Sequence, residues 1–110
     1  MPKSVGGSRK AAAEIRLVSV PGSPDAPFVF SPKEVTVPVG STVRWIDSED
    51  MFHTVTSTDS LEVRRPNGRF DHALFRTGDA FEYTFTKAGV YHYYCQPHST
   101  FMFGTVRVSG

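Results

Sequence analysis

The sequence predicts an all-β protein, a Greek-key sandwich of two sheets built from about seven to eight strands. Short β-branched and aromatic runs recur from Glu14 onward, and Pro and Gly residues punctuate them. No segment keeps a helical period of apolar residues for long. Short strands that alternate apolar and polar side chains close most economically as two packed sheets, with the core between their inner faces.

Turn signals separate the strands that we predict in the first half of the chain. These strands are residues 15–20, 28–30, 35–39 and 43–47. The cluster Pro21-Gly22-Ser23-Pro24 ends the first of them. Pro38 cannot donate a ladder hydrogen bond, which predicts an edge position or a bulge for the third. Val43, Trp45 and Asp47 share one face of the fourth, so we expect Asp47 to face the interior.

Alternation also predicts the strands of the second half and the direction of the cysteine. The strands are residues 53–57, 81–85, 90–95 and 105–109. Cys95 shares a face with Tyr91 and Tyr93, so its thiol is expected to point inward, whereas His92 and Tyr94 point outward.

Residues 58–79 interrupt this pattern as a long, polar connection. Its four arginines are Arg64, Arg65, Arg69 and Arg76. We expect a short helical turn at residues 72–75 and a functional or mobile loop elsewhere, because structureless connections of this length are uncommon.

Length and charge restrict the class of protein. A chain of 110 residues is expected to form one domain, residues 14–110, preceded by a flexible tail at residues 1–13 that has nothing periodic to bury. The net charge is only +1, and positive and negative residues are interspersed along the chain, which argues against a nucleic-acid partner. No apolar run approaches the roughly 20 residues of a transmembrane segment, and residues 1–13 lack the apolar stretch of a signal peptide.

Metal-binding side chains cluster in Cys95-Gln96-Pro97-His98-Ser99-Thr100-Phe101-Met102. The chain has a single cysteine, so an internal disulfide is excluded. Taken singly, a buried Cys or Met is usually a packing residue. Together with the distant His53, however, these residues offer two imidazoles, a thiolate and a thioether, the ligand set of a blue-copper electron-transfer site. The sequence predicts one mononuclear copper bound by His53, Cys95, His98 and, axially, Met102.

Other side chains are weaker candidates for this metal. Met51 is a reserve axial ligand because it lies two residues before His53. His92 has outward parity, and His72 lies in the long connection, so neither is expected to bind. Zinc is disfavoured because a thioether suits copper better.

Three segments resemble the cupredoxins, and within them the amicyanin, plastocyanin and pseudoazurin group. Residues 45–55 resemble the segment that delivers the first His ligand, residues 81–98 the strands that lead to Cys and the second His, and residues 102–108 the closing strand. The resemblance spans residues 14–110. It implies a cupredoxin-like sandwich with type 1 copper, and a backbone N–H of Thr54, or of a neighbour of Cys95, as a donor to the sulfur.

The sequence departs from this family pattern at three places. Three residues separate His98 from Met102, whereas amicyanin-like chains have fewer and plastocyanin-like chains more. Asp47 stands where the family usually has Asn, and Phe52 replaces the common Pro before the first His ligand.

We expect a monomeric one-electron carrier, not an enzyme, that passes electrons between transient protein redox partners, a membrane-associated partner among them. An apolar rim is expected around His98, formed by Phe52, Pro97, Phe101 and Phe103, with the loop arginines steering an acidic partner. A copper-delivery protein is one alternative. Another is an open axial position at which copper reacts with a small molecule such as nitric oxide. The resemblance implies a periplasmic or other extracytoplasmic location, which requires a leader that this chain lacks.

Overall fold

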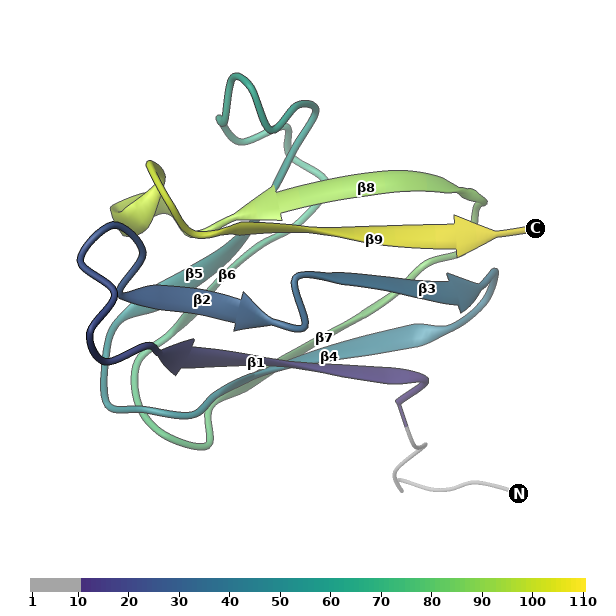
Figure 1. Cartoon of the computed structure of the whole chain (residues 1–110). Coiled ribbons are helices and arrows are strands. Elements are labelled where there is room, and N and C mark those ends of the chain that lie inside the picture. Colours follow the sequence, from purple (N-terminus) through teal and green to yellow (C-terminus); the bar gives the residue numbers. More distant parts are fainter. Residues whose placement is uncertain (1–10) are drawn as a thin grey trace.

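Two β-sheets pack face to face in the computed structural model, which describes residues 11–110 (Figure 1). The four-stranded sheet has the order β2-β1-β4-β7 and the five-stranded sheet the order β3-β9-β8-β5-β6. The elements are β1 (Ala13–Ser19), β2 (Phe28–Ser31), β3 (Glu34–Pro38), β4 (Thr42–Asp47), β5 (His53–Thr58), β6 (Asp71–Leu74), β7 (Ala80–Thr84), β8 (Gly89–Tyr94), the 3-10 helix η1 (Gln96–His98) and β9 (Phe103–Ser109). This confirms the predicted all-β sandwich, with nine strands in the described residues where about seven to eight were expected.

Both sheets are mixed, because two of their strand pairs are parallel. β1 lies parallel to β4, and β3 lies parallel to β9, while the remaining pairs are antiparallel. β3 is an edge strand, as Pro38 predicts. The chain crosses from the four-stranded to the five-stranded sheet between β2 and β3, each of which is an edge strand of its sheet.

The helical turn predicted at residues 72–75 is wrong, because residues 72–74 belong to strand β6. Four residues are too few for periodicity to separate a strand from a helical turn. The free edge of β5 decides the outcome: β6 pairs antiparallel with it, His53 opposite Leu74 and Thr56 opposite Asp71.

Tyr94 lies on the outer face of β8, as its parity predicts, yet its side chain is buried. Its register partner across the sheet is Phe103, so the two side chains share a face. Arg64, from the long connection, lies over the Phe103 ring. The outer face of β8 is therefore covered at this end of the sheet.

The predicted tail lies almost wholly outside the described residues. Residues 1–10 are not described, and β1 already begins at Ala13, one residue inside the predicted tail. Among residues 11–110, no helix has the length and apolar character needed to cross a membrane.

An aromatic core joins the sheets behind the predicted metal ligands. Trp45 and Phe30 each meet the Tyr93 ring edge-on, with ring centroids 5.3 and 4.8 Å away. Gly104 permits this packing, because a Cβ atom there would lie 2.4 Å from the Tyr93 hydroxyl oxygen. Such close-packed rings leave little freedom to the end of β8 that leads into Cys95.

Candidate metal centre

Three of the predicted ligands meet at one end of the sandwich, the end of η1 and of the β1–β2 loop (Figure 1). His53 begins β5, Cys95 follows β8, and His98 ends η1. Their ligand atoms all lie within 4.8 Å of one another. The Cys95 sulfur is 3.3 Å from Nδ1 of His98 and 3.7 Å from Nδ1 of His53. One soft sulfur and two imidazole nitrogens thus face a common point, a donor set that fits copper.

Backbone hydrogen bonds shape the ligand loop, which we define as residues 95–102. Cys95 caps η1, and Pro97 occupies its first turn, where no backbone donor is needed. The N–H of His98 donates to the carbonyl of Cys95, and both Phe101 and Met102 donate to the carbonyl of His98. The N–H of Cys95 donates to the carbonyl of Met102, 3.0 Å away. The loop is therefore closed on itself.

The sulfur of Cys95 is buried and receives a backbone hydrogen bond. The N–H of Thr54 lies 3.4 Å from it, as the family resemblance implies. Burial raises the pKa of the Cys95 thiol, while hydrogen bonds from the backbone of Thr54 and His98 act in the opposite direction. The metal-free protein therefore holds a thiol, and a metal must displace its proton.

Glu49 orients the imidazole of His53 by contacting the ring nitrogen that faces away from Cys95. Nε2 of His53 lies 3.0 Å from a Glu49 carboxylate oxygen, so His53 offers Nδ1 to the sulfur side and Nε2–H to the acid. A carboxylate behind a metal-binding imidazole fixes its tautomer and raises its basicity. The role of Glu49 was not predicted from the sequence. The turn between β4 and β5 brings Glu49 and His53 together, and no periodic pattern marks this contact.

The second imidazole is half-buried against aromatic rings. The centroid of the Phe28 ring lies 4.9 Å from that of His98 and 5.3 Å from that of His53, and the Phe101 centroid lies 5.5 Å from that of His98. Burial, followed by the nearby His53, lowers the pKa of His98, which favours the neutral imidazole that a metal needs. The role of Phe28 was not foreseen, because it depends on the path of the β1–β2 loop.

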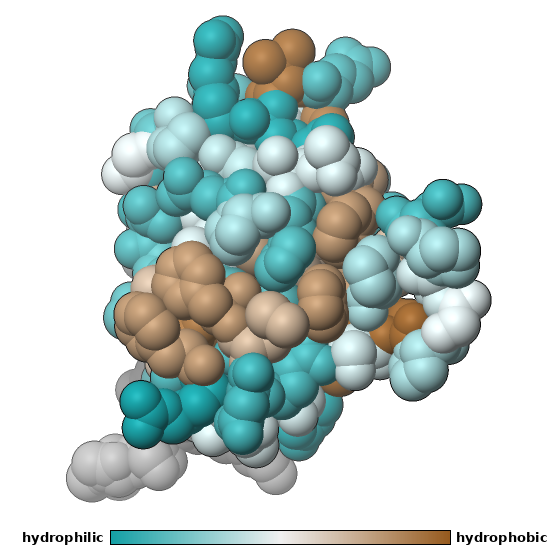
Figure 2. All heavy atoms as spheres, turned by 90° about the vertical axis from the view of Figure 1, so that its left-hand side faces the viewer, coloured by the Kyte–Doolittle hydropathy of each residue, from teal (hydrophilic) through white to brown (hydrophobic). Residues whose placement is uncertain are grey.

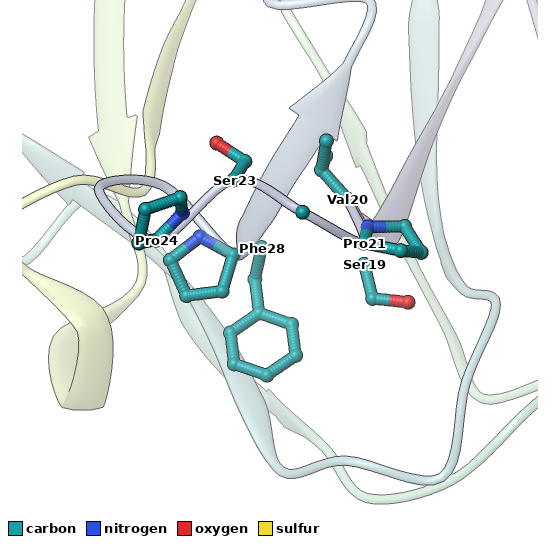
Figure 3. Close-up of a pocket in the computed structure, with 8 residues that line it drawn as sticks. Ser19, Val20, Pro21, Ser23, Pro24 and Phe28 are labelled. Carbon is teal, nitrogen blue, oxygen red and sulfur yellow. The ribbon is translucent and has the colours of Figure 1, made fainter.

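Phe28 also forms a wall of an open pocket in that loop. The pocket measures about 390 Å³, and Pro21, Pro24 and Phe28 supply much of its apolar lining (Figure 3). Phe28 therefore separates this pocket from the imidazole cluster.

The two methionine candidates differ in exposure. Met102, the last residue of the ligand loop, is fully buried, whereas Met51 is 38% exposed. This contrast favours Met102 as an axial ligand, which stays a prediction.

The two remaining histidines have other contacts. His72 stacks on Phe81 with ring centroids 4.8 Å apart, and Nδ1 of His92 lies 2.9 Å from the Thr105 hydroxyl. Neither joins the three-residue group of candidate ligands in the described part of the chain.

Asp47 is fully buried, as its parity in β4 predicts. One carboxylate oxygen accepts a hydrogen bond from the N–H of Glu49, and the other has no partner among the described residues. Burial raises the pKa of Asp47. The structure thus places a carboxyl group that resists ionisation beneath the turn leading to His53.

The expected apolar rim is only partly exposed. Figure 2 shows apolar side chains gathered in separate groups on this face. Phe52 is exposed and packs against the exposed Phe75, which the sequence analysis did not include. Phe103, by contrast, is half-buried beneath the cationic groups of Lys33 and Arg64.

Comparisons with known proteins agree on one family. The model of the copper-binding proteins of the plastocyanin/azurin family matches residues 18–109. A plastocyanin from Scenedesmus fuscus is 33% identical over 79% of this chain and 93% of its own. An amicyanin from Paracoccus denitrificans is 35% identical over 76% of this chain and 60% of its own length. The structure of a purple cupredoxin from Nitrosopumilus maritimus superposes with a TM-score of 0.76 and 32% identity, covering 88% of this chain and 99% of that one.

Proposed function

Since this chain belongs to the plastocyanin/azurin family of copper-binding proteins, we propose that His53, Cys95 and His98 bind its single type 1 copper, with Met102 as the weak axial ligand. The chain is a small electron-transfer protein that binds copper. When bound, copper supplies the Cu(I)/Cu(II) couple, and the protein supplies its geometry.

The convergence of one sulfur and two Nδ1 atoms is the observation that carries this ligand set. The hydrogen bonds of the ligand loop, the Thr54 N–H and the Glu49 carboxylate hold these side chains from several sides. A site fixed in this way rearranges little when its charge changes, which suits fast electron transfer.

Electrons enter and leave most directly at His98. Its imidazole is half-buried, whereas Cys95 and His53 are fully buried. The rings of Phe28 and Phe101 flank it and present an apolar surface to a transient protein partner. These features support a carrier that meets its partners briefly. We further propose that it acts as a monomer and has no enzymatic role of its own.

Titration of purified protein with Cu(II) tests this function. Visible and electron paramagnetic resonance spectra should show a strong thiolate charge-transfer band that disappears and returns through repeated reduction and oxidation. Cu(I) binding without a stable coloured Cu(II) form would favour copper delivery. A spectral change on adding nitric oxide would favour an open axial position.

Variants of the sulfur ligand provide the control for this titration. Cys95→Ser should remove the charge-transfer band while the metal-free protein keeps its fold, and a variant that kept the full colour would contradict the ligand set. We further propose a periplasmic or other extracytoplasmic location, which fractionation of the producing cell tests.

A further inference from the structure

We propose that Arg64 is a positioning residue that holds the ligand loop in place from outside, through the backbone carbonyl of Ser99. The inference rests on the proposed copper function, because the loop it fixes carries Cys95, His98 and Met102. Arg64 lies in the β5–β6 connection, residues 59–70.

Three contacts fix the guanidinium group of Arg64. Its Nε donates to the carbonyl of Ser99 at 2.5 Å, and its Nη1 donates to the carbonyl of Leu61. Its central carbon lies 4.8 Å from the centre of the Phe103 ring. Arginine is suited to this place, because its planar fork can bond two carbonyls while its face stacks on an aromatic ring.

At Ser99, a backbone carbonyl of the ligand loop accepts a hydrogen bond from a side chain outside the loop. The carbonyls of Cys95, His98 and Met102 all accept backbone hydrogen bonds from within the loop. In the structure of residues 11–110, the carbonyl of Ser99 accepts its hydrogen bond from Arg64. Because Ser99 directly follows His98 and precedes Met102 by three positions, its placement bears on both side chains.

Several hydrogen bonds tie the β5–β6 connection to β5. The Thr58 hydroxyl accepts from the N–H of Arg65, and the N–H of Asn67 donates to the carbonyl of Ser57. The Asn67 side chain bonds both Ser57 and Asp59. Arg64 is therefore anchored on β5, the strand that begins with His53, and reaches the loop that carries the other candidate ligands.

Paired substitutions separate the geometry of Arg64 from its charge. Arg64→Lys keeps the positive charge but loses the fork, and Arg64→Met loses both. Arg65→Lys and Arg65→Met are matched controls, because the side chain of Arg65 is exposed and makes no hydrogen bond within the described residues. Copper-loaded proteins are compared by the ratio of their charge-transfer bands, by electron paramagnetic resonance and by copper affinity.

We expect both Arg64 variants to change the band ratio and to lose about tenfold in copper affinity, the lower end of the range for groups that position metal ligands. The Arg65 variants should match the native protein. If native protein shows the copper band and Arg64→Lys and Arg64→Met leave it unchanged, or if the Arg65 variants shift it equally, the positioning role is wrong. Absence of the band in the native protein would instead overturn the proposed function.

A measurement without metal keeps the inference testable if a variant fails to fold. In the native metal-free protein, the Nε–H of Arg64 should exchange with solvent much more slowly than that of Arg65 in nitrogen–proton correlation spectra. Equal, fast exchange of the two would contradict the contact with Ser99.

Discussion

The backbone N–H of Thr54 points at the sulfur of Cys95 across 3.4 Å. The hydroxyl of the same threonine accepts a hydrogen bond of 2.8 Å from the N–H of Gln96, the residue after the cysteine. One residue of β5 thus holds both the sulfur and the backbone that follows it. The strand beginning with His53 and the loop carrying Cys95 are joined directly at the metal centre.

Thr54→Val tests the hydroxyl half of this link. Valine keeps the branched shape and the backbone N–H, but it removes the acceptor of the Gln96 N–H and the hydrogen bond between the buried hydroxyls of Thr54 and Thr56. We expect a loss of about 1 kcal/mol in the free energy of unfolding, the usual net contribution of an intramolecular hydrogen bond. Denaturant unfolding of the metal-free protein measures it. Thr42→Val is the control, because its hydroxyl bonds Thr84 on an exposed surface, and an equal loss there would contradict the argument.

Glu49→Ala tests the support behind the first imidazole. Without the carboxylate 3.0 Å from Nε2, the His53 ring loses its fixed orientation. We expect copper affinity to fall by about 10- to 100-fold, measured by competition with a chelator. Glu82→Ala is the control, since Glu82 pairs with Arg44 on the surface. An unchanged affinity for Glu49→Ala would show that the ring is held by packing alone.

Periodic patterns could predict the sandwich because they report directly which faces are buried. Val43, Trp45 and Asp47 alternate in β4, and all three are buried as expected. The short strand β6 was not predicted, because it forms by pairing with β5 and its own sequence pattern does not indicate a strand. The burial of Tyr94 could not be predicted for a related reason: a two-residue period assigns faces but cannot tell that a distant loop covers the outer one.

The same limit applies to the metal centre. His53, Cys95 and His98 could be identified because their side chains are of types that bind copper, and the structure brings them together. Glu49, Phe28 and Arg64 reach the centre through the conformations of turns and long connections. Their spacing in the sequence carries no regular signal of this proximity.

Copper binding should release a proton from Cys95. Burial raises the pKa of this thiol, so it is protonated near neutral pH and must ionise to bind. His98, whose pKa is lowered, is already neutral there. We therefore expect copper affinity to rise with pH, by about tenfold per unit for one displaced proton, until the thiol itself ionises. Calorimetry with Cu(I), in buffers of different ionisation enthalpy and without oxygen, counts the protons. Zero release would mean that the metal-free protein already holds a thiolate.

Asp47→Asn should change how stability depends on pH. Burial raises the pKa of Asp47 above its ordinary value of 3.8, so the folded protein binds this proton more tightly than the unfolded chain. Stability is then lost as pH rises from 3.8 through the folded-state pKa, and the penalty is constant above it. Asparagine carries no such penalty.

Unfolding of metal-free protein at several pH values checks this behaviour. The advantage of Asp47→Asn over the native protein should grow from about pH 4 upward and then level off. The exposed Asp25→Asn is the control. Parallel stability curves for the native protein and Asp47→Asn would contradict the assignment. In the copper-loaded variant, the charge-transfer band should persist while the reduction potential shifts.

The choice between the two axial candidates depends on their burial. Met102→Leu conserves volume at a fully buried position, so the protein should fold with a cost below about 1.5 kcal/mol. It removes the thioether, and since a weak axial ligand tunes the potential, both the potential and the ratio of the charge-transfer bands should change. Met51→Leu, at a site 38% exposed, should leave both unchanged. Electrochemistry and visible spectra of the two copper-loaded variants decide between them: an effect confined to Met51→Leu would transfer the axial role to Met51.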